Sequence, residues 1–204
     1  MHLKVLNKKQ EELIPYLKTF KHSFFLVGGT AIALHLGHRR SIDYDLFTNG
    51  SFNKSNIRKK LNPLPYKRSI LFEDIDQMHI LWNNVKTTFF QFPYKIEHPF
   101  KIEDIISMPL LIDLAAMKAF ALGRRSKWKD YVDLFFIIKN NFSISEISTK
   151  AIELFKDQFS EKLFREQIAF HKDIDYTEEV EFIESPVSKA EIRSFLIEKA
   201  IEIN

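Results

Sequence analysis

The chain has 204 residues, and its 45% hydrophobic content is enough to build a core in one large domain or two small ones. With 30 basic and 27 acidic residues, the formal net charge is +3, which excludes the strongly basic surface of a dedicated nucleic-acid binder. The chain has no cysteine, which excludes disulfides, thiolate metal sites and cysteine nucleophiles, so any metal must be held by oxygen or imidazole. No signal peptide or membrane span is visible, and we expect a cytoplasmic protein without a membrane partner.

The first half of the chain predicts an amphipathic helix, a buried strand, a second helix and a second strand. These elements cover residues 10–19, 24–27, 30–36 and 41–48. Gly28 and Gly29 form the turn after the first strand, and Gly37 is well placed to end the second helix. The predicted order is therefore strand, glycine turn, helix, strand.

The rest of the chain divides into a strand-rich segment and a helical one. A helix is expected at 52–61, followed by apolar strands near 70–72, 78–82 and 85–92, with Asn83 and Asn84 as a hairpin turn. After Pro99, helical spacing covers 108–122, 128–139, 147–155, 161–170 and 189–203. We therefore expect an α+β fold in which a mixed sheet with flanking helices, residues 1–99, is packed against a helical C-terminal region, residues 100–204.

Two aspartates in the second predicted strand are the first candidates for chemistry. Asp43 and Asp45 are two residues apart, so on a strand both side chains point to one face, roughly 6–7 Å apart, and can grip one hard cation. Two carboxylates held together repel each other, and a bound Mg²⁺ is a natural way to keep both ionised. Taken alone, such a pair is more often solvated surface than a site.

The glycine turn is the second candidate. Gly28 and Gly29 allow the backbone to approach a ligand closely, and a helix beginning at Thr30 directs its free N–H groups at an anion such as a triphosphate. The Thr30 hydroxyl could add a donor. A Gly-Gly pair alone is usually only a turn, but the combination with the aspartates in this order is far more specific.

The string LVGGTAIALHLGHRRSIDYDLFT, from Leu26 to Thr48, resembles the nucleotidyltransferase superfamily of DNA polymerase β, and more closely its AbiEii/AbiGii toxin-like branch. The resemblance extends to VKTTFFQFPYKIEHP from Val85 and to IDLAAMKAFALGRRSKWKDYVDLFFI from Ile112. It covers most of the chain in the family's order.

The resemblance assigns roles to individual residues. It implies that the phosphate-contacting turn is Gly28, Gly29 and Thr30, and that the metal ligands are Asp43 and Asp45. A lysine that contacts the nucleotide phosphates corresponds to Lys118, and an aspartate that assists catalysis corresponds to Asp130.

Other charged residues allow two interpretations each. Arg125 lies where it could share a helix face with Lys118, which is either a phosphate ligand or a lysine at the edge of the core. Asp130 could instead form a cap or salt bridge, and Asp133 is the more structural of the two aspartates. The segment His38 to Arg40 either steadies phosphates and orients the aspartates or is a solvated loop.

One position departs from the family pattern. Active members generally carry a third carboxylate on a neighbouring strand, and the matching position here is Thr88, which cannot ionise. The third carboxylate usually completes the metal site and deprotonates the attacking hydroxyl. Catalysis is therefore expected to be weak, moved to Asp130, or lost.

The resemblance implies an enzyme that uses Mg²⁺ or Mn²⁺ to transfer NMP from an NTP to an acceptor hydroxyl. The acceptor could be a tRNA 3′ end or another RNA, and the chain would be the toxin of a toxin–antitoxin or abortive-infection system with a cognate antitoxin. The alternative is a nucleotide- or RNA-binding protein of the same fold without turnover, for which Thr88 is the main argument. A third hypothesis is a regulator that acts only through protein contacts.

Overall fold

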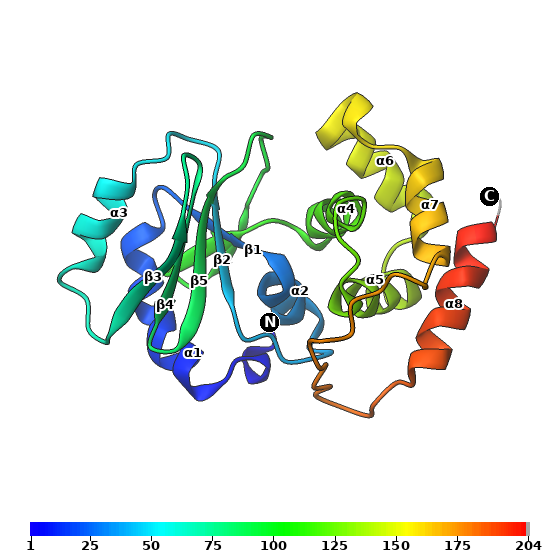
Figure 1. Cartoon of the computed structure of the whole chain (residues 1–204), viewed down its shortest axis with the longest axis horizontal. Coiled ribbons are helices and arrows are strands. Elements are labelled where there is room, and N and C mark those ends of the chain that lie inside the picture. The colour runs from blue at the N-terminus through cyan, green and yellow to red at the C-terminus, as the bar shows by residue number, and fades with distance from the viewer. Residues whose placement is uncertain (203–204) are drawn as a thin grey trace.

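The computed structural model describes residues 1–202, which form a sheet part and a helical part side by side (Figure 1). The main sheet has five strands in the order β1-β2-β5-β4-β3. Their bounds are β1 Phe25–Val27, β2 Tyr44–Thr48, β3 Arg68–Glu73, β4 Gln77–Trp82 and β5 Val85–Gln91. Strands β2 and β5 are parallel and the other neighbours are antiparallel, so the sheet is mixed.

One face of the sheet is buried and the other is partly open. Alternate residues such as Leu46, Ile80 and Phe89 are buried, and Phe20 packs on Phe89 with their ring centroids 5.0 Å apart. Phe20 ends a segment formed by helix α1 (Lys8–Leu13) and 3₁₀-helix η2 (Ile14–Phe20), which covers this face; a short 3₁₀-helix, η1 (Leu3–Val5), precedes it. The opposite face carries Asp45, and a cleft separates part of this face from the helical part.

The predicted order of strand, helix and strand is confirmed, but the bounds shift: Gly28 and Gly29 are the first residues of the helix, and the second strand begins at Tyr44 and not at residue 41. Strand β1 leads directly into helix α2 (Gly28–Leu36), which ends at Gly37 in the left-handed conformation with φ +73°. The hairpin between β4 and β5 is also confirmed: Asn83 and Asn84 have φ of 52° and 61°, as a type I′ turn requires.

Two local predictions need correction. The first predicted helix ends as an α-helix at Leu13 because Pro15 cannot donate the next backbone hydrogen bond, and the chain continues as 3₁₀-helix. The predictions also missed a small hairpin of β6 (Phe100–Ile102) and β7 (Ile106–Met108), whose strands are too short to show a period. In contrast, the helix predicted at 52–61 is confirmed as α3 (Lys54–Leu61).

The C-terminal part is helical, as predicted. It contains α4 (Leu111–Leu122), α5 (Trp128–Asn140), α6 (Ile144–Phe155), 3₁₀-helix η3 (Lys156–Gln158), α7 (Glu161–Ala169) and α8 (Lys189–Ile201). The predicted end of the last helix, at residue 203, lies outside the described residues. Within residues 1–202 no helix is long and apolar enough to cross a membrane. The α+β fold class is confirmed, and the domain division at residues 99 and 100 stays a prediction.

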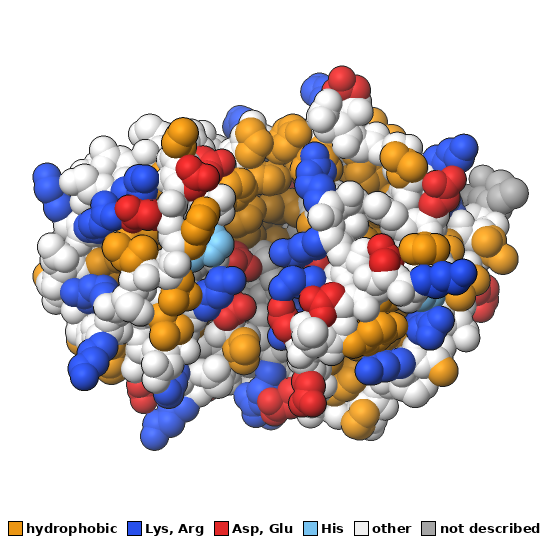
Figure 2. Space-filling view, viewed as in Figure 1, with side chains coloured by type: hydrophobic (Ala, Val, Ile, Leu, Met, Phe, Trp, Pro, Cys, Tyr) orange, Lys and Arg blue, Asp and Glu red, His pale blue; other side chains and the backbone are white. Residues whose placement is uncertain are grey.

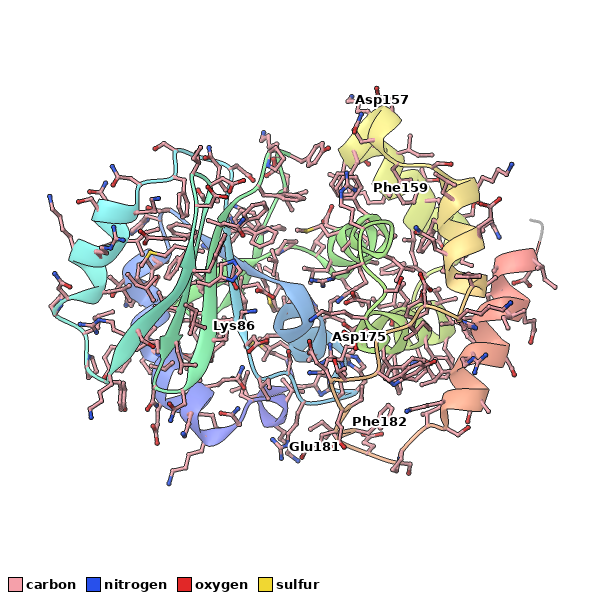
Figure 3. All side chains as sticks on the ribbon, in the orientation of Figure 1. Lys86, Asp157, Phe159, Asp175, Glu181 and Phe182 are labelled. Carbon is pink, nitrogen blue, oxygen red and sulfur yellow. The ribbon has the colours of Figure 1, made fainter. Side chains whose placement is uncertain are left out.

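The segment between α7 and α8, residues 170–188, returns across the molecule as a C-terminal strap. Asp175 forms a β-bridge with Lys127 at the start of α5, and Phe182 forms one with Arg39 ahead of β2. The backbone N–H of Arg40 also donates to the Glu181 carbonyl at 2.8 Å. Figure 3 labels Asp175, Glu181 and Phe182 along this path. The strap therefore contacts both parts of the molecule.

A buried ion network joins the same two parts. Asp133 on α5 is fully buried and accepts two hydrogen bonds from the Arg39 guanidinium, at 2.7 and 2.8 Å, and one from His38 at 2.7 Å. Its second oxygen is 2.9 Å from Nζ of Lys118 on α4. Burial alone would raise the pKa of Asp133, but Arg39, Lys118 and the His38 hydrogen bond hold that pKa well below its usual range.

We predict that Asp133→Asn lowers the free energy of unfolding by about 3–5 kcal/mol, because it leaves the Arg39 and Lys118 charges buried without their counter-ion. Urea unfolding measures the change. Asp104→Asn is the matched control: Asp104 pairs with Lys18 and Lys21 at an exposed position, so its loss should change little. Equal effects of the two variants would contradict the role given to Asp133.

Candidate active site

A cleft of about 530 Å³ lies between the open face of the sheet and helix α4. Figure 2 shows this hollow between the two halves, with charged side chains of both signs on its walls and hydrophobic surface at one end. The charged and polar lining residues are Asp45, Gln77, His79, Lys86, Thr88, Lys118, Arg124 and Arg125. The apolar lining includes Phe47, Phe90, Tyr94, Met117 and Phe120. The cleft therefore offers a polar region next to an aromatic one.

Asp45 lies on the second strand, as predicted, and lines the cleft, whereas the strand begins one residue after Asp43, which is not among the residues lining the cleft. Asp45 is the second residue of β2, and both aspartates are half-buried. Burial raises the pKa of Asp43, and the nearby Asp45 carboxylate raises it further. Burial also raises the pKa of Asp45, although Arg125 and Lys118 act in the opposite direction. Both carboxylates are thus held in an environment that disfavours their charge, which a bound cation would reverse.

The carboxylates of Asp43 and Asp45 are suited to a hard divalent cation that is also bound by the phosphates of a nucleotide. Carboxylate oxygens are the ligands that Mg²⁺ and Mn²⁺ prefer. Among residues 1–202, no group of three or more His, Asp or Glu side chains is arranged to hold a metal. Asp43 and Asp45 would therefore need further oxygens from water or from phosphate, as is usual for Mg²⁺ at nucleotide sites.

The turn before α2 brings free backbone N–H groups to the same place. Helix α2 begins at Gly28, and no side chain caps it. Its first N–H groups have no partner within the helix, and together with the helix dipole they favour an anion. The Thr30 hydroxyl is already used, because it donates to the carbonyl of Asp43 and lies 2.9 Å from the Ser41 hydroxyl. The Thr30 side chain thus fixes the position of Asp43.

Both glycines of the turn are required by close contacts. Gly28 has φ +72°, and a Cβ there would collide with Oδ2 of Asp45. A Cβ on Gly29 would lie 2.7 Å from Nη2 of Arg39, which holds Asp133. The turn therefore packs directly on the Asp45 carboxylate on one side and on the buried ion network on the other.

Lys118, Arg125 and Asp130 form one cluster on the helical wall of the cleft. Lys118 is 5% exposed, and its Nζ lies 2.7 Å from Oδ1 of Asp130. The Arg125 Nε donates to the other oxygen of Asp130 at 2.9 Å, and about half of the Arg125 side chain is exposed. Burial would raise the pKa of Asp130, but Lys118 and Arg125 lower it. Asp130 is therefore a weak proton acceptor that positions two cations facing Asp45.

Thr88 lies beside Asp45 on the neighbouring strand. The two residues are partners in the β2–β5 register, and the Thr88 hydroxyl is close enough to lower the pKa of the Asp45 carboxylate. The side chain at this position is thus in direct reach of the aspartate pair. That active relatives carry a carboxylate here stays a prediction.

The structure argues against two of the roles considered for His38 and Arg39, a solvated loop and a phosphate contact, and it is compatible with the third, orienting the aspartates. Both are buried on Asp133, so they are not a solvated loop, and their side chains do not reach the cleft lining. Arg40 lies nearer the surface and pairs with Glu181 of the strap at 2.5 Å. These residues hold the segment that leads into Asp43.

Sequence reasoning missed several polar residues of the site. Lys86, on β5, lines the cleft two residues from Thr88, and Figure 3 shows it on the sheet side opposite Asp175 of the strap. His79 on β4 is the register partner of Thr88. The alternation of strand residues would have placed both on the face of Thr88, since side chains two residues apart share a face. No local signal would have indicated Glu178, which binds Lys129 from the strap at 2.9 Å.

Comparison with known proteins identifies the family of this chain. The model of the family described as "Nucleotidyl transferase AbiEii toxin, Type IV TA system" matches residues 16–109 and 93–201. A protein of Aquifex aeolicus (strain VF5), aq_aa25, is 32% identical over 152 residues, which are 71% of this chain and 73% of the relative.

Two solved structures share the fold. MenT4, a nucleotidyltransferase toxin of Mycobacterium tuberculosis, has a TM-score of 0.62 at 12% identity and covers 94% of this chain and 80% of its own. JHP933 from Helicobacter pylori has a TM-score of 0.56 at 14% identity and covers 96% and 91%. The family match spans nearly the whole chain, and the protein therefore belongs to the AbiEii family of nucleotidyltransferase toxins of toxin–antitoxin systems.

Proposed function

We propose that the protein transfers NMP from an NTP to an acceptor hydroxyl in a reaction that depends on Mg²⁺ or Mn²⁺. The observation that carries the proposal is the pair of half-buried carboxylates, Asp43 and Asp45, whose pKa values are both raised, with Asp45 against Gly28 and the Asp43 carbonyl held by Thr30. Without a cation this arrangement is unfavourable, and with one it becomes a binding site. Asp43 and Asp45 are the proposed metal ligands.

The triphosphate would lie between the turn and the helical wall. The N–H groups of Gly28, Gly29 and Thr30 face the anion from the start of α2. Lys118 and Arg125 lie across the cleft, close enough to Asp45 to lower its pKa. Arg125 is the more exposed of the two cations and can form a hydrogen bond to a phosphate oxygen. Lys118 is buried and contributes its positive charge to the electrostatic potential of the cleft.

The transfer is an in-line substitution at the α-phosphorus. The acceptor hydroxyl loses its proton to a general base, its oxygen forms a bond to that phosphorus, the bond to the β-phosphate oxygen breaks, and pyrophosphate leaves with its negative charge. A bound divalent cation supplies charge neutralisation on the phosphate oxygens. The residues of the chain bind and orient: Asp130 holds Lys118 and Arg125 in place, and the turn aligns the triphosphate.

Membership of the family supports a proposal for the acceptor and the cellular role. We propose an RNA acceptor, such as the 3′ end of a tRNA, in the cytoplasm, and inhibition by a cognate antitoxin. The aromatic end of the cleft, with Phe90 and Tyr94 half-exposed, offers surface on which a nucleobase can stack. The near-neutral net charge implies that RNA is held locally at the cleft.

The second candidate function is nucleotide or RNA binding without turnover. It is favoured by one observation: Thr88, beside Asp45, has a neutral hydroxyl at a position from which a carboxylate could deprotonate the acceptor. Both candidates require metal-dependent NTP binding, and only the first requires transfer.

The proposal predicts label transfer from an α-labelled NTP to RNA. Wild-type protein incubated with each NTP, Mg²⁺ and total RNA should label RNA with at least one nucleotide. EDTA, Asp43→Asn and Asp45→Asn should each reduce transfer by roughly 10²-fold or more, because each removes the cation or one of its ligands. Metal-dependent NTP binding without any labelled RNA would instead establish the second candidate.

A second prediction concerns Thr88→Asp, which places a third carboxylate beside Asp45. The affinity for Mn²⁺ or Mg²⁺ should rise about tenfold or more, because an anionic oxygen attracts a hard cation better than a hydroxyl does. In EDTA the same variant should be less stable than wild type, because a third charge joins a pair whose pKa values are already raised.

Metal titration by calorimetry and thermal melts in EDTA measure the two effects. Ser69→Asp, on the exposed edge strand β3, is the control for adding a carboxylate elsewhere on the sheet. If Thr88→Asp leaves metal affinity unchanged, Asp43 and Asp45 are not the metal site.

A further inference from the structure

His79 occupies the position next to Thr88 on the side away from Asp45. The β4–β5 register pairs His79 with Thr88, and the β5–β2 register pairs Thr88 with Asp45. The three side chains therefore stand in one row across the open face of the sheet, and all three line the cleft. His79 is half-buried, so its ring is accessible from the cleft.

Two neighbours fix the orientation of the His79 ring. Its Nε2 lies 3.0 Å from Oε1 of Gln77, which is two residues away on the same strand and also lines the cleft. We assign the tautomer in which Nε2 donates to this amide oxygen, which leaves Nδ1 with a lone pair. The Phe72 ring packs edge-on against the imidazole, with centroids 5.5 Å apart.

The charges around His79 keep it neutral. Burial lowers its pKa, the Lys86 ammonium on β5 lowers it further, and the more distant Asp45 on β2 acts in the opposite direction. From β3 the ring meets the uncharged Phe72. A neutral imidazole with a free Nδ1 is available as a proton acceptor at pH 7, unlike Asp130, which is held ionised by two cations.

His79 is placed for a proton and not for the metal. It does not join Asp43 and Asp45 in a three-residue group that could hold a cation in the described part of the chain. We propose that His79 is the general base of the transfer, accepting the proton of the acceptor hydroxyl in place of the carboxylate that Thr88 lacks. This inference rests on the transferase function proposed above.

The step is balanced without any further reactant. The O–H bond of the acceptor breaks as its proton passes to Nδ1 of His79, the freed oxygen forms its bond to the α-phosphorus, and pyrophosphate leaves. The imidazolium then returns its proton to solvent through the open side of the cleft. Gln77 is a positioning residue, since it acts only through the tautomer and orientation of His79.

The test is single-turnover label transfer to RNA at saturating Mg²⁺ and NTP, from about pH 5.5 to 9. In wild type the rate should fall as the pH drops through the lowered pKa of His79, because protonation removes the base. His79→Asn should be slower by roughly 10²–10⁴-fold near pH 8 and should lose this acid limb, while Mg²⁺-NTP affinity stays at the wild-type value. Added imidazole should restore part of the rate of His79→Ala.

Controls separate the base from a structural role. His22→Asn, at an exposed position outside this cleft, should keep the wild-type rate and pH profile. A slow His79→Asn that retains the acid limb, together with a His79→Ala that imidazole does not rescue, would show that His79 only supports the site and would overturn the inference. Wild-type rates in both His79 variants would overturn it while leaving the transferase function intact. Absence of transfer by the wild type would overturn both.

Discussion

The carboxylate of Asp133 joins parts of the chain that are far apart in sequence, and the geometry of the cleft depends on it. It binds His38 and Arg39, which lie just before the strand that carries Asp45, and Lys118, which lies in the opposite wall. Arg39 in turn packs against Gly29 of the turn. One buried charge thus sets the positions of the sheet side and the helical side of the site relative to each other.

The pKa values of four carboxylates in and around the cleft are shifted in opposite directions. Asp130 and Asp133 are surrounded by cations, and their pKa values are lowered. Burial raises the pKa values of Asp43 and Asp45, and Asp45 raises that of Asp43 further. The first pair stabilises the fold, whereas the second stores an unfavourable interaction that a cation can relieve. Such a difference between neighbouring carboxylates is typical of a functional site.

The features that the sequence predicted are those with a local signal. Hydrophobic period, the Gly28 turn and the Asn83 hairpin identify the elements, and the spacing of Asp43 and Asp45 identifies the pair. The family resemblance added Lys118 and Asp130, which the structure brings together with Arg125.

What the sequence could not show depends on contacts between distant segments. Asp133 and Arg39 are 94 residues apart, and no spacing rule predicts their pairing. The strap residues 170–188 lack any period, yet they form bridges to both parts of the molecule. His79 became a candidate only when the β4–β5 register placed it beside Thr88. The Thr30 hydroxyl donates to the Asp43 carbonyl and not to a ligand, and this contact between separate segments could not be predicted from the sequence.

The central claim is that Asp43 and Asp45 hold a divalent cation together with the triphosphate. The most direct measurement is a crystal structure with Mn²⁺ and a non-hydrolysable NTP analogue, in which anomalous scattering locates the metal. The account predicts a Mn²⁺ peak bounded by the Asp43 and Asp45 carboxylates, with triphosphate oxygens at the start of α2 facing Arg125. A nucleotide bound in the cleft with no metal at this pair, or a metal held elsewhere, would contradict it.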